Sequence, residues 1–151
     1  MAKGPVLFGT AGIPRSAEKR SSVAGIARVR ALGLDAMELQ FMRRVAMGKE
    51  TAQSLCRAAA DNRIRLSAHA PYYINFNSED PEKVTASRER LLAAARVADV
   101  CGARNVVFHA AFYHDDPLST VYERVTAQVE QVAQQVRDEG LDVCLRPETG
   151  G

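Results

Sequence analysis

The chain has 151 residues, of which 46% are hydrophobic and 25% are charged. These values are typical of one globular domain with a real core, and they exclude a disordered or fibrous protein. The formal net charge of +2 is too small to identify a nucleic-acid or membrane partner. No apolar run is long enough to cross a bilayer, and the first residues lack the pattern of a signal peptide. We therefore expect a cytoplasmic protein with no membrane partner.

Short apolar runs alternate with longer helical patterns from one end of the chain to the other, which is typical of βα units. The predicted strands span residues 6–11, 36–41, 64–68, 105–110 and 142–146. The predicted helices span residues 22–32, 49–62, 81–101 and 118–139. The chain therefore reads as four βα units followed by a fifth strand.

Two Asp-Pro pairs predict helix starts. Asp80 and Asp116 each precede a proline, so each carboxylate can cap a helix whose first residue is that proline. Helix stops are equally well marked, because a glycine in the left-handed conformation can close a helix. Three helices end before such a glycine, namely Gly33, Gly102 and Gly140, and Asn62 is the best candidate in the remaining case.

A repeat connects these stops. Each of the segments GLDAMELQF, NRIRLSAHA, GARNVVFHA and GLDVCLRPE runs from a helix stop through a short strand to a polar residue. The period is on the order of 40 residues, the length of one βα unit. Such a series predicts a parallel sheet that is either open or curled toward a TIM barrel. No glycine-rich phosphate loop follows the first strand, which weakens the nucleotide-binding alternative.

The three cysteines Cys56, Cys101 and Cys144 are widely spaced and include no CxxC pair. An odd number without such a pair indicates reduced thiols rather than a disulfide framework or a cysteine zinc site. We therefore expect reduced cysteines in the core.

Three residues of the metal-ligating type stand at the ends of three successive predicted strands: His69, His109 and Glu148. Alternation along each strand directs all three to one face of the sheet, at the edge where TIM barrels carry their active sites. Two imidazoles and one carboxylate form a known catalytic zinc set. A lone histidine at a strand end is more often a core residue, so the prediction depends on all three being in phase.

Two tyrosines, Tyr72 and Tyr73, follow the third strand. They could form a packed lid, or one phenol could position a substrate phosphate or a metal-bound water. On the second strand Glu38 and Gln40 share the polar face. Glu38 is therefore a candidate for supporting the site.

Other charged residues have two interpretations each. Arg43 and Arg44 follow the second strand, either as a solvated loop or as contacts to a DNA phosphate. Arg146 points the same way as Glu148, so it would either orient that carboxylate or form a plain buried ion pair. For His114, beside two aspartates, we favour a solvated or capping role.

Four segments, FGTAGIP, LSAHAPYYINFNS, SRERLLAAARVADVCGARNVVFHAAFY and RPETGG, occur in this order. Together they resemble the endonuclease IV family of the xylose-isomerase-like TIM barrels, most closely its archaeal-type branch, over essentially the whole chain. The resemblance implies an α/β fold, a partial (β/α) TIM barrel of about four βα units plus the fifth strand. It also implies an endonuclease with up to three zinc ions that cleaves double-stranded DNA on the 5′ side of abasic sites.

The resemblance also assigns residues. His69 and His109 match the family's metal-binding histidines after the third and fourth strands, and Glu148 matches the glutamate that bridges two metals. Tyr72 matches a tyrosine near the scissile phosphate. On this basis Tyr72 and Glu148 are the expected catalytic residues, and Tyr72 also contacts DNA.

The family pattern continues through further strands and ligands, whereas the sequence given ends three residues after Glu148. It therefore holds the ligands of one metal and part of a second set. A half barrel would leave two sheet edges and an inner apolar face uncovered, which predicts self-association unless the reading frame is incomplete. Two other functions stay open: a sugar isomerase or epimerase of the same superfamily in which Glu38 transfers a proton, and a non-catalytic fragment.

Overall fold

The computed structural model describes residues 6–149. Gly150 and Gly151, which end the RPETGG segment, lie outside the described residues. Strands and helices alternate in the order β1 (Gly9–Ala11), α1 (Ser22–Ala31), β2 (Ala36–Gln40), α2 (Lys49–Asn62), β3 (Arg65–His69), α3 (Pro81–Cys101), β4 (Asn105–His109), α4 (Leu118–Asp138) and β5 (Cys144–Glu148). The predicted series of βα units is confirmed.

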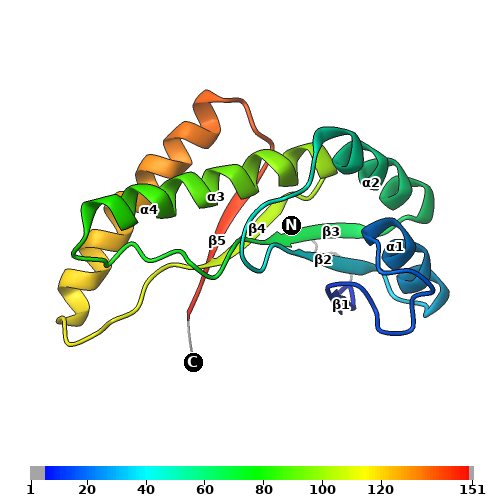
Figure 1. Ribbon diagram of the computed structural model, residues 1–151, viewed down its shortest axis with the longest axis horizontal. Coiled ribbons are helices and arrows are strands. Elements are labelled where there is room, and N and C mark those ends of the chain that lie inside the picture. The colour runs from blue at the N-terminus through cyan, green and yellow to red at the C-terminus, as the bar shows by residue number, and fades with distance from the viewer. Residues whose placement is uncertain (1–5, 150–151) are drawn as a thin grey trace.

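The five strands form one parallel sheet in the order β1-β2-β3-β4-β5. Each strand lies beside the strand that follows it in the chain, so every helix is a crossover between neighbours. Figure 1 shows the four helices on one side of a twisted sheet, while no described helix covers the other side. The sheet therefore has one face buried under helices and one open face, which we call the inner face.

The predicted strand 6–11 is too long, because β1 begins at Gly9. Before it, the Phe8 carbonyl accepts from the N–H groups of both Asp35 and Ala36, and this brings the two chain segments close together. A Cβ at Gly9 would lie 2.1 Å from the Ala36 carbonyl oxygen, so only glycine permits this approach. At the other edge, β5 extends to Glu148 rather than ending at residue 146.

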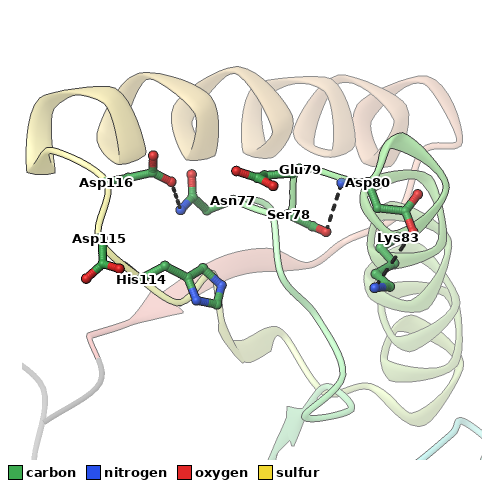
Figure 2. A pocket seen from close by; sticks show the side chains of 8 residues that line it. All are labelled: Asn77, Ser78, Glu79, Asp80, Lys83, His114, Asp115 and Asp116. Atoms are coloured by element: carbon green, nitrogen blue, oxygen red, sulfur yellow. Dashed lines mark hydrogen bonds and ion pairs between the residues drawn. The ribbon is translucent and has the colours of Figure 1, made fainter.

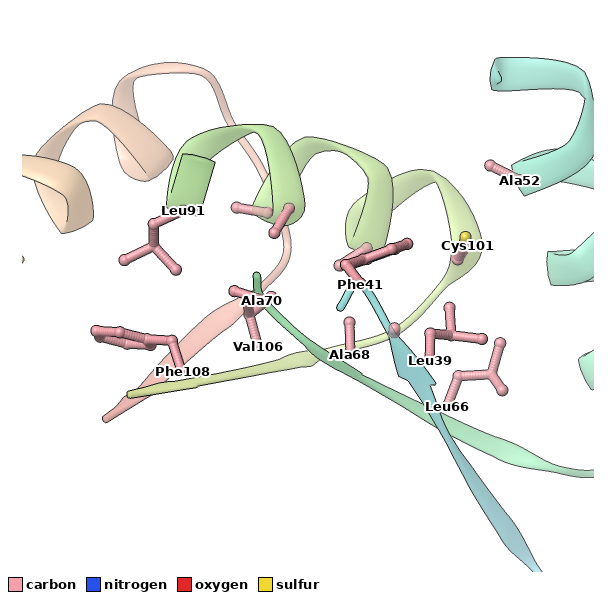
Figure 3. Packing of buried hydrophobic residues seen from close by; sticks show 14 of the residues in the cluster. Leu39, Phe41, Ala52, Leu66, Ala68, Ala70, Leu91, Cys101, Val106 and Phe108 are labelled. Atoms are coloured by element: carbon pink, nitrogen blue, oxygen red, sulfur yellow. The ribbon is translucent and has the colours of Figure 1, made fainter. Parts of the chain in front are cut away.

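Alternation along the strands explains the core. One phase of each central strand is buried against the helices, namely Met37 and Leu39 of β2, Leu66 and Ala68 of β3, and Val106 and Phe108 of β4. Figure 3 shows several of these side chains beneath α3, with Leu91 close to Phe108. The Phe108 ring also meets Phe76 edge-on, with centroids 6.2 Å apart. The apolar phase of the strands therefore packs against the helices.

The expectation of an apolar inner face is wrong for the same reason. The other phase of the strands is mainly polar, and it includes Glu38, Gln40, Ser67, Asn105 and Arg146. All five are half-buried or exposed. The open face consequently presents hydrogen-bonding groups and charges, and it offers little hydrophobic drive for association.

One of the two predicted aspartate caps is confirmed. Asp80 caps α3, and its carboxylate accepts from the N–H of Glu82 at 2.9 Å. Asp116 does not cap α4, whose N-cap is Pro117 without a side-chain bond. Its carboxylate instead accepts from Asn77 at 3.0 Å and from Arg124 at 3.1 Å. A tertiary network has therefore replaced the local cap.

The predicted glycine stops are confirmed, since Gly33, Gly102 and Gly140 all have positive φ. The prediction for Asn62 is wrong, because this residue stays in the helix and donates to the Ala58 carbonyl at 2.8 Å. Its neighbour Arg63 takes the left-handed position instead, with φ of 55°.

All three cysteines are free, but they differ in exposure. Cys101 is buried, Cys56 is half-buried and Cys144 is exposed, so the prediction of core thiols holds fully for Cys101 only. Within residues 6–149 no helix combines the length and hydropathy needed to cross a membrane.

Candidate metal centre

The three predicted ligands are the last residues of neighbouring strands: His69 ends β3, His109 ends β4 and Glu148 ends β5. Glu148 lies in register with His109, whereas His69 lies in register with Val107 and is thus two residues nearer the start of β4. The two imidazole rings are nevertheless close despite this two-residue offset, since their centroids lie 5.2 Å apart. The structure therefore brings together the three residues that the sequence placed in phase.

The ligand atoms converge on one point. Oε2 of Glu148 lies 3.4 Å from Nε2 of His69 and 3.6 Å from Nε2 of His109. One ligand atom from each residue lies within 4.8 Å of the others. Zinc ligands bind at about 2.1 Å, so two ligands of a tetrahedral ion stand about 3.4 Å apart. The separations fit a single zinc ion held by these three residues.

Hydrogen bonding prepares His69 for this role. Its Nδ1 lies 2.9 Å from the Ala70 carbonyl, which can only accept, so Nδ1 carries the proton. The lone pair is then on Nε2, the atom that faces Glu148. The side chain of His69 is only 8% exposed, whereas those of His109 and Glu148 are 39% and 50% exposed. One ligand is fixed in the fold and the other two are open to incoming molecules.

Tyr72 lies over the histidine pair, with ring centroids 5.3 Å from His69 and 5.7 Å from His109. Its hydroxyl donates to Oε1 of Gln40 at 3.3 Å. Gln40 is in register with His69, and its amide nitrogen donates to Glu38 at 2.5 Å. Sequence reasoning placed Gln40 on the polar face but gave it no role. The signal that could have identified Gln40 is its spacing of two residues from Glu38, which places both side chains on the same face of β2.

Other predicted site residues follow β2 and β3 in the chain. The Tyr72 N–H donates to the Met42 carbonyl at 3.2 Å, which ties the start of the β2–α2 loop to the end of β3. Arg43 and Arg44 follow Met42 in that loop and are exposed. Tyr73 is also exposed, and its carbonyl accepts from Arg90.

Arg146 has a different partner from either one expected. Its Nε donates to Oδ1 of Asn105 at 2.9 Å, and the side chain is exposed rather than buried in an ion pair. This bond joins Arg146, two residues before Glu148 on β5, to Asn105, four residues before His109 on β4. Arg146 therefore fixes the strand that carries the carboxylate, without contacting the carboxylate through any bond within residues 6–149.

A separate cavity of about 500 Å³ lies between the β3–α3 and β4–α4 loops. It is lined by Asn77, Ser78, Glu79, Asp80, Lys83, His114, Asp115 and Asp116, and Figure 2 shows these side chains. None of the three converging ligands lines it. His114 is exposed and has φ of 51°, in agreement with the expected solvated role.

Residues 26–151 match the family described as xylose isomerase-like TIM barrel. The chain belongs to this family. An uncharacterised protein of Methanocaldococcus jannaschii is 38% identical over 146 residues, which are 97% of this chain and 52% of that protein. The chain thus spans about half the length of this relative.

Solved structures of xylose isomerase-like barrels show the same fold and the same half-length match. An L-ribulose 3-epimerase has a TM-score of 0.71 at 18% identity and covers 93% of this chain and 49% of its own. Endonuclease IV from Thermus thermophilus has a TM-score of 0.65 at 19% identity, covering 86% and 48%. A second Thermus thermophilus protein, soaked with zinc chloride, has a TM-score of 0.61 at 29% identity, covering 79% and 48%. The predicted partial TIM barrel is confirmed, in a family that contains enzymes of more than one kind.

Proposed function

We propose that the chain carries the amino-terminal part of a zinc-dependent endonuclease site that cleaves DNA on the 5′ side of abasic sites. The observation that carries this proposal is the convergence of two imidazole Nε2 atoms on one oxygen of Glu148, at 3.4 and 3.6 Å. The resemblance of the segments around these residues to the endonuclease IV family supports the choice of substrate.

The ligand types favour zinc over magnesium or manganese. Two of the three ligands, His69 and His109, are imidazoles, which suit zinc, copper, iron and nickel, whereas magnesium and manganese prefer oxygen ligands. Bound zinc would polarise a phosphoryl oxygen and lower the pKa of a water molecule toward neutrality. A hydrolytic reaction uses both effects.

The chain's own residues would then divide the work. His69 fixes one ligand position because it is buried and its tautomer is set by the Ala70 carbonyl. His109 and Glu148 complete the ligand set from the open side. Tyr72, whose ring lies beside both histidines, is placed to orient a reacting group.

The surroundings of the site support a nucleic-acid substrate. Arg43 and Arg44 are exposed on the loop that is bonded to the Tyr72 backbone, and we propose that they contact DNA phosphates. Exposed aromatic side chains follow two of the ligand strands, with Tyr73 after β3 and both Phe112 and Tyr113 after β4. Exposed aromatic rings can stack on unpaired bases, which an abasic site provides.

The test is incision of a duplex with one abasic site by zinc-loaded protein, compared with the same duplex without that site. We expect incision on the 5′ side, loss of incision with a chelator, and loss in His69→Ala and His109→Ala. The chain has three histidines, so His114→Ala is a matched control and should retain activity. If zinc-loaded protein neither incises nor preferentially binds the abasic duplex, the proposal is refuted.

A metal-dependent sugar epimerase is the second candidate. Glu38 favours it, because this half-buried carboxylate lies on the inner face, one alternation step before the layer of Gln40 and His69. A carboxylate in that position could move a proton on a small sugar. A Glu38→Gln variant distinguishes the two functions. It should abolish epimerisation of a ketose, whereas abasic-site incision should persist at a reduced rate because the three metal ligands are unchanged.

We also propose that copies of this chain associate through the sheet edges. Within residues 6–149, β1 and β5 each have one neighbouring strand, and unpaired edges favour strand addition. Sedimentation at several concentrations should give twice the mass of one chain. A single-chain mass at every concentration would refute association.

A further inference from the structure

The position of Tyr72 beside the two histidines allows two roles: contact with a phosphate oxygen, or contact with a water molecule. The choice depends on where its single hydroxyl proton lies. The relevant contacts form a chain from Glu38 through Gln40 to Tyr72.

The Glu38 carboxylate determines the orientation of the Gln40 amide. A carboxylate only accepts hydrogen bonds, so the side of the amide that faces Glu38, at 2.5 Å, must be the NH₂ group. The opposite side, the carbonyl oxygen, then faces Tyr72 at 3.3 Å. Because a carbonyl only accepts, Tyr72 must be the donor.

Once the proton of Tyr72 is directed at Gln40, the phenol oxygen has only lone pairs for another partner. A phosphodiester oxygen carries no proton, so it cannot bond to those lone pairs. Water and hydroxyl groups carry protons and can donate to them. The hydrogen bond to Gln40 therefore determines that the Tyr72 oxygen, beside His69 and His109, can bind only a group that donates a hydrogen bond.

We propose that Gln40 is a positioning residue that keeps Tyr72 a hydrogen-bond acceptor, so that Tyr72 orients the attacking water rather than a phosphate oxygen. The water would donate one hydrogen to the Tyr72 oxygen and thereby turn a lone pair toward its target. No covalent bond forms or breaks at Tyr72. The identity of the water as the attacking group rests on the proposed function, whereas the hydrogen-bond state of Tyr72 does not.

The first test measures that state directly, on protein without metal. The tyrosine Fermi doublet in the Raman spectrum distinguishes donor from acceptor phenols, and the difference between wild type and Tyr72→Phe isolates Tyr72 among the four tyrosines. We expect a donor spectrum in wild type and its loss in Gln40→Leu, in which Tyr72 has no acceptor at position 40. An unchanged Tyr72 spectrum in Gln40→Leu overturns the inference.

Two further variants serve as a control and as an independent version of this test. Gln53→Leu changes an exposed glutamine on α2 and should leave the Tyr72 spectrum unaltered. Glu38→Gln leaves Gln40 in place but replaces an acceptor-only carboxylate with an amide that can accept or donate, so the Gln40 amide is no longer held in one orientation. We expect a mixed donor and acceptor spectrum in that variant, so the inference stays testable if Gln40→Leu does not fold. A pure donor spectrum there contradicts the role given to Glu38.

The second test uses dimethyl phosphate, a phosphodiester anion that carries no proton, as an acceptor-only probe on zinc-loaded protein. In wild type, Tyr72→Phe should change the phosphate affinity less than about twofold. In the Gln40→Leu background the hydroxyl is free to donate, so Tyr72→Phe should weaken phosphate binding about fivefold, the equivalent of one net hydrogen bond. A fivefold loss in wild type overturns the inference.

The two levels of the proposal fail separately. A protein that neither incises nor preferentially binds the abasic duplex, but gives the expected Raman spectra, refutes the nuclease and keeps the role of Gln40. A protein that incises abasic DNA, but whose Tyr72 spectrum is the same in wild type and in Gln40→Leu, refutes the role of Gln40 alone.

Discussion

Glu148→Gln tests the metal centre by removing one ligand charge at a position that the fold does not need. The Glu148 side chain is 50% exposed, and its bonds within residues 6–149 are to the two histidines. Without metal, we therefore expect a change of less than about 0.5 kcal/mol in the free energy of unfolding.

With zinc the two proteins should differ clearly. Free zinc at about 100 times its dissociation constant stabilises a protein by about 2.7 kcal/mol. For a chain of this size that raises the melting temperature by about 5–11 °C. Removing a residue that hydrogen-bonds to a metal ligand weakens metal binding by about 10–100-fold. Removing a ligand itself should therefore weaken metal binding by at least about 100-fold. The same zinc then stabilises Glu148→Gln by only about 0.4 kcal/mol, or roughly 1–2 °C.

Scanning calorimetry at fixed free zinc measures this difference. Glu130→Gln changes an exposed carboxylate on α4 and should keep the full shift, as should His114→Ala. If Glu148→Gln keeps the full zinc shift as well, the three residues do not form the site.

Other predictions concern the fold. Phe108→Ala should lower the free energy of unfolding by about 3–5 kcal/mol in denaturant titrations, because the ring is fully buried; a loss below about 1 kcal/mol would contradict the packing. Burial raises the pKa of the Cys101 thiol to about 12, so native protein should be alkylated at exposed Cys144 and not at Cys101, as peptide mass spectrometry can show. The same shift means that the folded state keeps a proton that the unfolded state releases, so stability should fall as pH rises above roughly 8.5, and less steeply in Cys101→Ala. A hydrogen bond from Arg96 lowers the pKa of the Glu139 carboxyl, so this pair should stabilise the fold near neutral pH and lose its effect as pH falls through that lowered pKa; Glu139→Gln should therefore differ from wild type at neutral pH and match it in acid.

The sequence predicted those features that depend on local rules. Alternation by two residues placed His69, His109 and Glu148 on one face, and the short reach between neighbouring strands then brought them together. Glycines such as Gly102 marked the helix ends because few other residues adopt positive φ without strain.

Features that depend on contacts between distant segments could not be predicted in this way. Asp116 has the sequence of a helix cap but bonds to Asn77, which lies 39 residues earlier. Arg146 was assigned to Glu148 from its direction along the strand, yet the side chain of Asn105 on the next strand offered an acceptor. Gln40 gained its role only through Tyr72, which is 32 residues away.

The position of β5 has a thermodynamic consequence. Glu148 is held by a strand with one described neighbour, whereas His69 is held by a strand with two. Any segment that pairs with the free edge of β5 would restrict the motion of this one ligand and so raise the affinity for metal. By reciprocity, metal binding would strengthen that pairing by the same factor. Edge pairing and metal affinity in this protein should therefore be measured as linked equilibria, each titrated in the presence and absence of the other.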